Sequence, residues 1–169
     1  MKTETLTLSQ LEQYLSKAAW ILKGPIGASD FKAYIFPLLF FKRISDVYDE
    51  EYQAALEESE GDEDYASLPE FHRFIIPAGC HWNDVRDTTS NIGLKIETCL
   101  RAIESANQDK LYGIFGDAQW SNKESLPDRL LTDLVEHFSQ YTLSTALVAR
   151  DMLGQAYEYL IKHFADLTN

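Results

Sequence analysis

Four histidines and two cysteines are the side chains of this sequence best suited to bind a transition metal or carry a reaction. Zinc sites usually draw on close pairs, such as two cysteines separated by two residues or two histidines separated by three. Neither pairing occurs here, so the sequence predicts no zinc site. The residues concerned are His72, His81, His137, His163, Cys80 and Cys99.

Local patterns that build catalytic and cofactor sites are also missing. Ser139 stands near His137, but no GxSxG turn presents it as a nucleophile. The glycines at 24–27 and 113–116 match neither GxGxxG nor the Walker pattern. The acidic tract 49–64 lacks the ligand alternation of a calcium loop and is interpreted as a solvated face and loop. We therefore expect no catalytic, cofactor or metal site in this chain.

Charge is distributed unevenly along the 169 residues. Residues 1–43 hold six basic and three acidic residues, 44–71 hold eleven acidic and no basic ones, and 72–169 hold nine basic and thirteen acidic ones. The total of −12 argues against autonomous binding of nucleic acid, because nonspecific affinity comes mainly from basic groups that neutralise phosphates. Any DNA contact must be local or depend on partners.

The basic N-terminal segment holds the candidate DNA contacts. Its basic and aromatic residues interleave, which suits a phosphate backbone, although an ordinary helix surface explains the same pattern. We take Lys32, Lys42 and Arg43 as the DNA-contact candidates. The full set is Lys17, Lys23, Lys32, Lys42 and Arg43, with Trp20, Phe31 and Tyr34 among them.

Apolar spacing predicts one mainly α-helical domain over residues 1–169, a helical bundle with at most a short strand-like segment near 74–76. The first helix is expected after Ser9, with Glu12 completing a capping box. Pro37 is expected to kink the second helix. The helices are predicted after 9, from 29 or 30 to about 56, from 83 or 84, from about 92 to 107, from 127 to about 138 and from about 152 to 164.

The N-terminus and the apolar runs bear on location. The first ten residues show no secretory signal, and the longest apolar run, 34–41, is far shorter than the roughly 20 residues that span a bilayer. We therefore expect a cytoplasmic protein that does not enter the membrane. In that reducing compartment, Cys80 and Cys99 are expected to be free buried thiols rather than a disulfide.

The most unusual stretch is DMLGQAYEYLIKHFA at 151–165, one helix with an apolar stripe and a glycine. Gly154 permits close approach of another backbone at some loss of helix stability, although the periodicity is also that of a C-terminal core helix. The stretch closely resembles the end of the N-terminal helical domain in the modification subunit of type I restriction-modification systems.

Other segments share this resemblance, which runs from about Leu8 to Thr168. They are FKAYIFPLLFFKRISDVYDEE at 31–51, FIIPAGCHW at 74–82 and AIESAN at 102–107. Pro37 departs from the small or aliphatic residue expected in the family.

The resemblance implies that a catalytic domain follows residue 169, and that the full-length subunit is an adenine-specific DNA methyltransferase using S-adenosylmethionine. Its adenine-binding motif, Asn or Asp followed by two prolines and an aromatic residue, is absent, because every proline here follows Gly, Phe, Leu or Ile. This chain alone is therefore expected to bind no cofactor and to catalyse nothing.

The resemblance also implies partners, namely the DNA-specificity subunit, a second modification subunit, the restriction subunit and double-stranded DNA held by the assembled complex. We expect docking through Gly154, Tyr157 and Tyr159. The alternative is a stand-alone acidic helical adaptor that binds a protein partner without DNA.

Overall fold

Helices form nearly all of the regular structure in the computed structural model, which describes residues 5–27 and 30–168; in the last helix the side chains of 157, 160, 161 and 163–168 lie outside this description. Within these ranges there is no strand, residues 74–76 are irregular, and one isolated bridge joins Lys23 and Ile26. The mainly α-helical prediction is confirmed. The elements are α1 (Leu8–Leu22), α2 (Phe31–Glu58), α3 (Glu63–Ala66), the short 3-10 helix η2 (Pro69–Phe71), α4 (Trp82–Arg86), α5 (Ile92–Ala106), α6 (Gln108–Leu111), α7 (Asp128–Phe138) and α8 (Arg150–Thr168).

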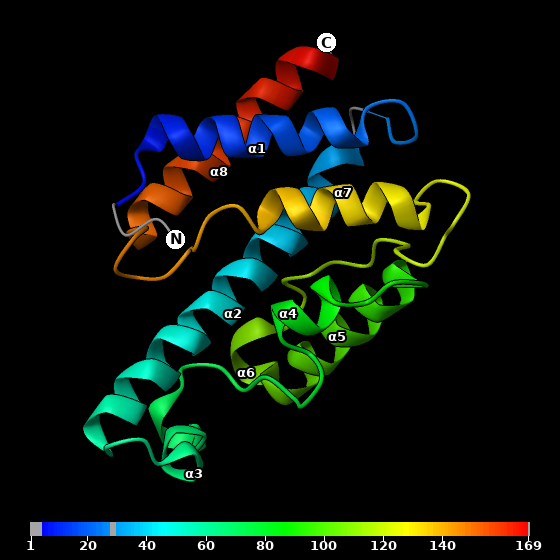
Figure 1. Cartoon of the computed structure of the whole chain (residues 1–169). Coiled ribbons are helices and arrows are strands. Elements are labelled where there is room, and N and C mark those ends of the chain that lie inside the picture. The colour runs from blue at the N-terminus through cyan, green and yellow to red at the C-terminus, as the bar shows by residue number, and fades with distance from the viewer. Residues whose placement is uncertain (1–4, 28–29, 169) are drawn as a thin grey trace.

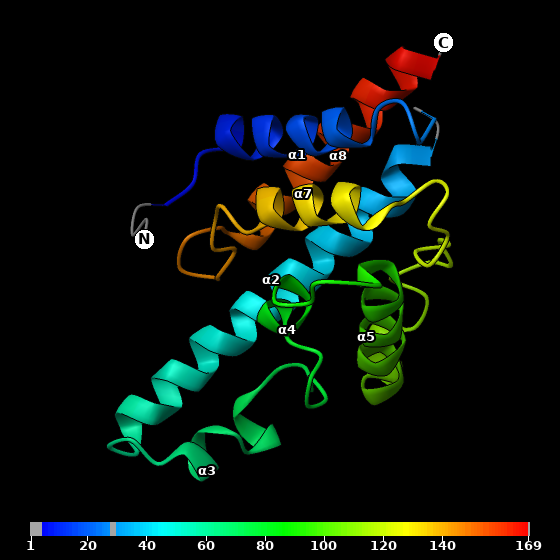
Figure 2. The same ribbon diagram turned by 45° about the vertical axis from the view of Figure 1, so that its right-hand side comes forward.

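The long helix α2 is the axis of the fold. Its N-terminal half is packed between α1, α7 and α8 on one side and α4, α5 and α6 on the other (Figures 1 and 2). Its C-terminal half stands away from this bundle and packs against α3 and η2. The exposed area of 9532 Å² exceeds the roughly 8,500 Å² expected for a compact chain of 19.3 kDa, as a projecting helix requires.

Capping groups and packing explain where the first two helices run. Thr7, and not Ser9, caps α1: its hydroxyl accepts from the Gln10 N–H at 3.1 Å, and the Gln10 side chain accepts from the Thr7 N–H at 2.8 Å. The predicted capping box of Ser9 and Glu12 is therefore wrong, because the same spacing occurs two residues earlier. Helix α2 continues through Pro37, whose missing N–H costs one helical bond in a buried, apolar stretch.

Helices α1 and α7 are joined by two buried hydrogen bonds that run in opposite directions. The Tyr14 hydroxyl donates to the Phe138 carbonyl at 2.6 Å, and the His137 Nε2–H donates to the Tyr14 carbonyl at 2.7 Å. The Gln140 amide donates to His137 Nδ1 at 3.3 Å. With one ring nitrogen donating and the other accepting, this geometry is that of a neutral imidazole.

The acid stability of the fold should depend on His137. Burial lowers the pKa of His137 below its ordinary value of 6.5, and the nearby Lys17 cation acts in the same direction. A lowered pKa in the folded state gives stability that is complete above the unfolded value and is lost as the pH falls through the folded one. The free energy of unfolding should therefore decrease as the pH is lowered below 6.5.

Urea denaturation of the normal chain and of His137→Gln at neutral and mildly acidic pH checks this. The glutamine keeps an amide donor but does not titrate, so the variant should lose less stability on acidification. Equal losses of unfolding free energy in the two proteins would show that His137 does not cause the acid sensitivity.

Helix α5 is held in place by α7 and by the segment that precedes α7. The Asp128 carboxylate accepts from the N–H groups of Asn91 and Ile92 at 3.0 and 3.1 Å, so α7 caps the start of α5. One residue further, a Cβ added to Gly93 would lie 1.9 Å from the carbonyl oxygen of Trp120. Glycine is required there because the two backbones touch.

Two helical glycines should therefore respond in opposite ways to alanine. Gly93→Ala should destabilise the fold by about 2 kcal/mol or more, because a buried backbone must move. Gly154→Ala, where an added Cβ meets no atom of the described residues within 4 Å, should stabilise α8 by up to about 1 kcal/mol. Denaturant unfolding of both variants measures the difference, and a tolerated Gly93→Ala would contradict the close approach.

Candidate functional site

Charged side chains on α2 hold the segment 141–148, which leads into α8. Lys42 and Asp46, one turn apart, form an ion pair, and Lys42 is only 4% exposed. Its ammonium also donates to the Tyr141 carbonyl at 2.8 Å, and Asp46 accepts from the Leu143 N–H at 2.7 Å. Burial raises the pKa of Asp46, and the Lys42 cation counteracts part of the rise. These groups bind the protein's own backbone.

Arg43 and Glu50 hold the same segment from the neighbouring positions. Arg43 Nη1 lies 2.8, 3.0 and 2.8 Å from the carbonyl oxygens of Leu143, Ser144 and Val148. Glu50 accepts from the backbone N–H groups of residues 145 and 146, each at 3.0 Å. Burial alone would raise the pKa of Glu50, but the hydrogen bond from the Thr145 hydroxyl and these two backbone bonds bring it below its ordinary value.

The three predicted DNA contacts are therefore placed differently. Lys32 is exposed near the start of α2, whereas the Lys42 and Arg43 charges face the protein. A direct phosphate contact by the three stays a prediction, and the geometry favours Lys32 among them. Sequence reasoning missed the structural role of the other two, although charges at 42, 43, 46 and 50 in a largely apolar helix indicate a polar partner on that face.

Stability should separate Lys32 from Arg43. Arg43→Ala leaves three carbonyl groups without their charged donor and should cost about 2 to 3 kcal/mol of unfolding free energy. Lys32→Ala removes an exposed side chain and should change stability by less than about 0.5 kcal/mol. Thermal and urea unfolding of both variants decide it, and an Arg43→Ala protein as stable as the parent would refute the backbone-holding role.

A basic and aromatic surface lies where α1 ends. Trp20 is 68% exposed, and the Lys23 ammonium lies 4.2 Å above its ring. Lys17, one turn earlier on the same helix, is exposed as well. Figures 1 and 2 show the end of α1 close to the beginning of α2, where Lys32 stands. An exposed indole with one lysine over its ring and two further exposed lysines on the same two helix ends suits a polyanion better than the buried pair on α2 does.

The predicted docking residues lie on α8. Gly154 is exposed, and Tyr159 is half-buried. The Tyr157 side chain lies outside the described residues. Their role in docking stays a prediction.

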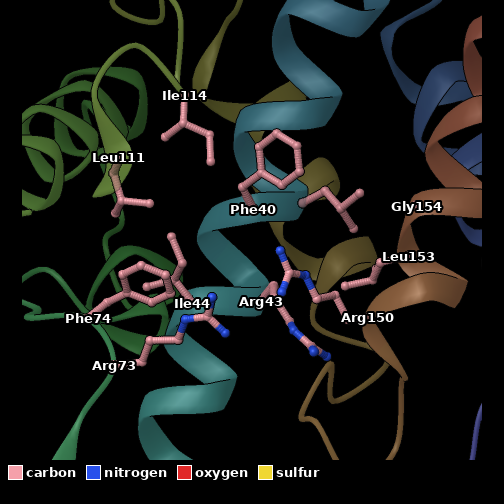
Figure 3. Close-up of a pocket in the computed structure, with 11 residues that line it drawn as sticks. Phe40, Arg43, Ile44, Arg73, Phe74, Leu111, Ile114, Arg150, Leu153 and Gly154 are labelled. Carbon is pink, nitrogen blue, oxygen red and sulfur yellow. The ribbon is translucent and has the colours of Figure 1, made fainter. Parts of the chain in front are cut away.

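Gly154 and Leu153 also line a groove of about 380 Å³ between α2 and α8. Figure 3 shows the Arg43, Arg73 and Arg150 guanidinium groups gathered in one part of this groove, with Phe40, Leu111 and Ile114 in the other. We call this cavity the arginine groove. Its lining is Leu39, Phe40, Arg43, Ile44, Arg73, Phe74, Leu111, Ile114, Arg150, Leu153 and Gly154.

Candidate nucleophiles in the described part of the chain are occupied or unreactive. The Ser139 hydroxyl donates to the Val135 carbonyl at 2.7 Å and accepts from Trp82 Nε1 at 2.9 Å, while the neighbouring His137 faces α1. Cys80 and Cys99 are free and buried, as predicted, and burial raises the pKa of Cys99 to about 12. A thiol that stays protonated is a poor nucleophile. Over the described residues, no three His, Cys, Asp or Glu side chains gather to hold a metal ion.

The chain matches the family described as the HsdM N-terminal domain over residues 11–138. It belongs to this family. No curated protein sequence matches it. Among the described residues of this HsdM N-terminal domain, no helix has the length and apolarity needed to cross a bilayer.

A solved structure shows the same fold. The chain is similar to the methyltransferase subunit of a type I restriction-modification system from Streptococcus thermophilus, with a TM-score of 0.64 and 22% sequence identity. The similarity covers 94% of this chain but only 39% of that one. The chain thus spans well under half the length of that subunit.

Proposed function

We propose that this chain is the N-terminal assembly and DNA-clamping domain of an adenine-specific DNA methyltransferase subunit in a type I restriction-modification system. The family match over residues 11–138 is the observation that supports it. In this proposal S-adenosylmethionine and catalysis belong to the domain that follows in the full-length subunit. The occupied Ser139 and the protonated Cys99 fit a domain that does no chemistry itself.

The protein contacts in this proposal are with the specificity subunit, the neighbouring modification subunit and the restriction subunit. Helix α8 is the proposed docking element, because Gly154 leaves open space on its surface. The α2 charges that hold residues 141–148 fix where α8 begins, so the docking surface is positioned before a partner arrives.

The DNA contact in this proposal lies where α1 ends and α2 begins. Lys17, Lys23 and Lys32 are exposed there, with Trp20 among them. At a net charge of −12 the chain repels DNA at long range, but salt screens charges over about 8 Å, so a local basic surface acts once partners have brought DNA close. The contact is therefore a supporting one and carries no base specificity.

The decisive experiment measures the DNA affinity of the assembled complex against salt concentration. Changing Lys17, Lys23 and Lys32 together to Ala should weaken binding about equally on specific and unrelated DNA. The magnitude of the salt slope should fall by about two to three, since each phosphate contact contributes about 0.9. The matched control replaces Arg86, Lys95 and Arg101, which lie on α4 and α5 and remove the same charge.

Three results would count against the proposal. An unchanged dependence of DNA affinity on salt would mean that the DNA surface lies elsewhere. An equal loss of affinity in the control variant would mean that the effect comes from net charge alone. Failure of the full-length protein to join the other subunits or methylate DNA supports the alternative of an acidic adaptor that works without DNA.

A further inference from the structure

The arginine groove is electrostatically unlike the rest of this acidic chain. The chain has 27 acidic and 15 basic residues, yet the groove is lined by three arginines and no acidic side chain. The Lys110 ammonium adds to this positive surface, because it donates to the Arg73 carbonyl at 2.9 Å beside the Phe74 ring. Over the described residues, the groove is therefore a local positive site on a negative protein.

The groove cations differ in how far the fold already occupies them. Arg43 is fixed by the three carbonyl groups of the segment 143–148, and burial lowers its pKa. Arg73 and Arg150 are exposed, and no carboxylate in the described part of the chain pairs with either guanidinium. Arg73 Cζ lies 5.5 Å from the centre of the Phe74 ring, a contact that leaves the N–H donors at the edge of the guanidinium available.

The remaining walls are apolar and, besides Phe74 on the loop after η2, belong to three separate parts of the chain. Phe40 lies on α2, Leu111 and Ile114 lie at and after α6, and Leu153 lies on α8. Ile114 is 36% exposed. Gly154 forms part of the rim and leaves room for an approaching side chain or backbone. An occupant of this groove therefore gains apolar contact on one side and charge-assisted hydrogen bonds on the other.

We propose that the arginine groove binds a segment of a partner protein in which Asp or Glu residues flank a large apolar side chain. The carboxylates would pair with Arg73 and Arg150, and the apolar side chain would pack against Phe40, Ile114 and Leu153. This inference deepens the docking part of the proposed function and rests on it, because it names the site and the chemistry of one partner contact.

Charge and shape favour this occupant over three others. A DNA duplex offers phosphates to the arginines but no flexible apolar group for the opposite wall. A second copy of this chain offers the acidic residues 57–64, EESEGDED, but its nearest exposed large apolar side chain, Leu68, lies four residues beyond that tract and is not flanked directly by acidic residues. A free inorganic anion likewise leaves the apolar wall exposed.

The test uses the chain itself and a blocked synthetic helical peptide with Phe and Leu on one face and Glu on either side of them. Titration calorimetry should give saturable one-to-one binding, and the methyl resonances of Leu111, Ile114 and Leu153 should shift. Three control probes isolate the chemistry: the same peptide with Gln for Glu, an acidic peptide without apolar residues, and a short DNA duplex. Each should bind at least about tenfold more weakly.

Matched variants locate the site. Arg73→Glu with Arg150→Glu should weaken peptide binding by about tenfold or more, because the new charges repel the carboxylates. Arg129→Glu with Lys123→Glu changes the net charge equally at exposed positions outside the groove and should have little effect. Arg150 and Arg129 both lie in the first turn of a helix, so both exchanges favour the helix dipole and preserve the fold.

Gly154→Leu tests the groove by filling it. Among the described residues an added side chain meets no atom within 4 Å at its Cβ, and leucine favours helix, so the variant should be at least as stable as the parent while losing peptide binding. Leu94→Ser, at an apolar position 55% exposed outside the groove, serves as its apolar control and should bind normally.

Several results would overturn the inference. They are absence of peptide binding, binding that survives both groove variants, equal binding of the duplex, and self-association that removing the charges of residues 57–64 abolishes. The samples in these measurements contain neither the assembled DNA-bound complex nor the other subunits. A failed groove test therefore leaves the salt-dependence experiment intact, and a failed salt experiment leaves peptide binding intact.

Discussion

Backbone groups that leave water must find hydrogen-bond partners, and α2 supplies them for the connection between α7 and α8. Residues 141–148 form no helix, so their carbonyl and amide groups turn to Lys42, Arg43, Asp46 and Glu50. This arrangement sets the start of α8 and, through the bond from the Leu6 N–H to the Leu147 carbonyl at 3.0 Å, the start of α1 as well. The packing of α1 against α7 and α8 follows from it.

The acidic half of α2 has two functions rather than one. The sequence suggests a solvated tract, and this is right for its exposed end beyond Glu57. Asp46 and Glu50 instead accept backbone N–H groups of residues 143, 145 and 146, and Glu51 accepts from the Arg73 N–H at 3.2 and 3.3 Å. Carboxylates therefore hold two irregular segments against the same helix, which explains why so many of them stand together.

Local patterns were sufficient to predict the longer helices and the family, because both depend on residues close together in sequence, but they did not predict the short helices α3, η2 and α6. The spacing from 92 to 107 predicts α5 to within a residue, and Pro127 marks the start of α7. The roles of Lys42 and Arg43 depend on groups about 100 residues away, which no local pattern encodes. The same holds for the glycines, since only the Trp120 carbonyl distinguishes Gly93 from Gly154. The arginine groove could not be predicted from the sequence, because its three arginines come from α2, the loop after η2 and the start of α8.

The length of α2 has an electrical consequence. At 1.5 Å per residue its 28 residues span about 42 Å, several screening lengths in physiological salt. Lys32 stands in its first turn, with Lys17 and Lys23 on the neighbouring end of α1, and the acidic tract 57–64 begins at its last turn, so the charges form a permanent dipole along this axis. Near a polyanion, a molecule with this dipole experiences a torque as well as a net repulsion. It rotates so that its acidic tip points away and its lysine end leads.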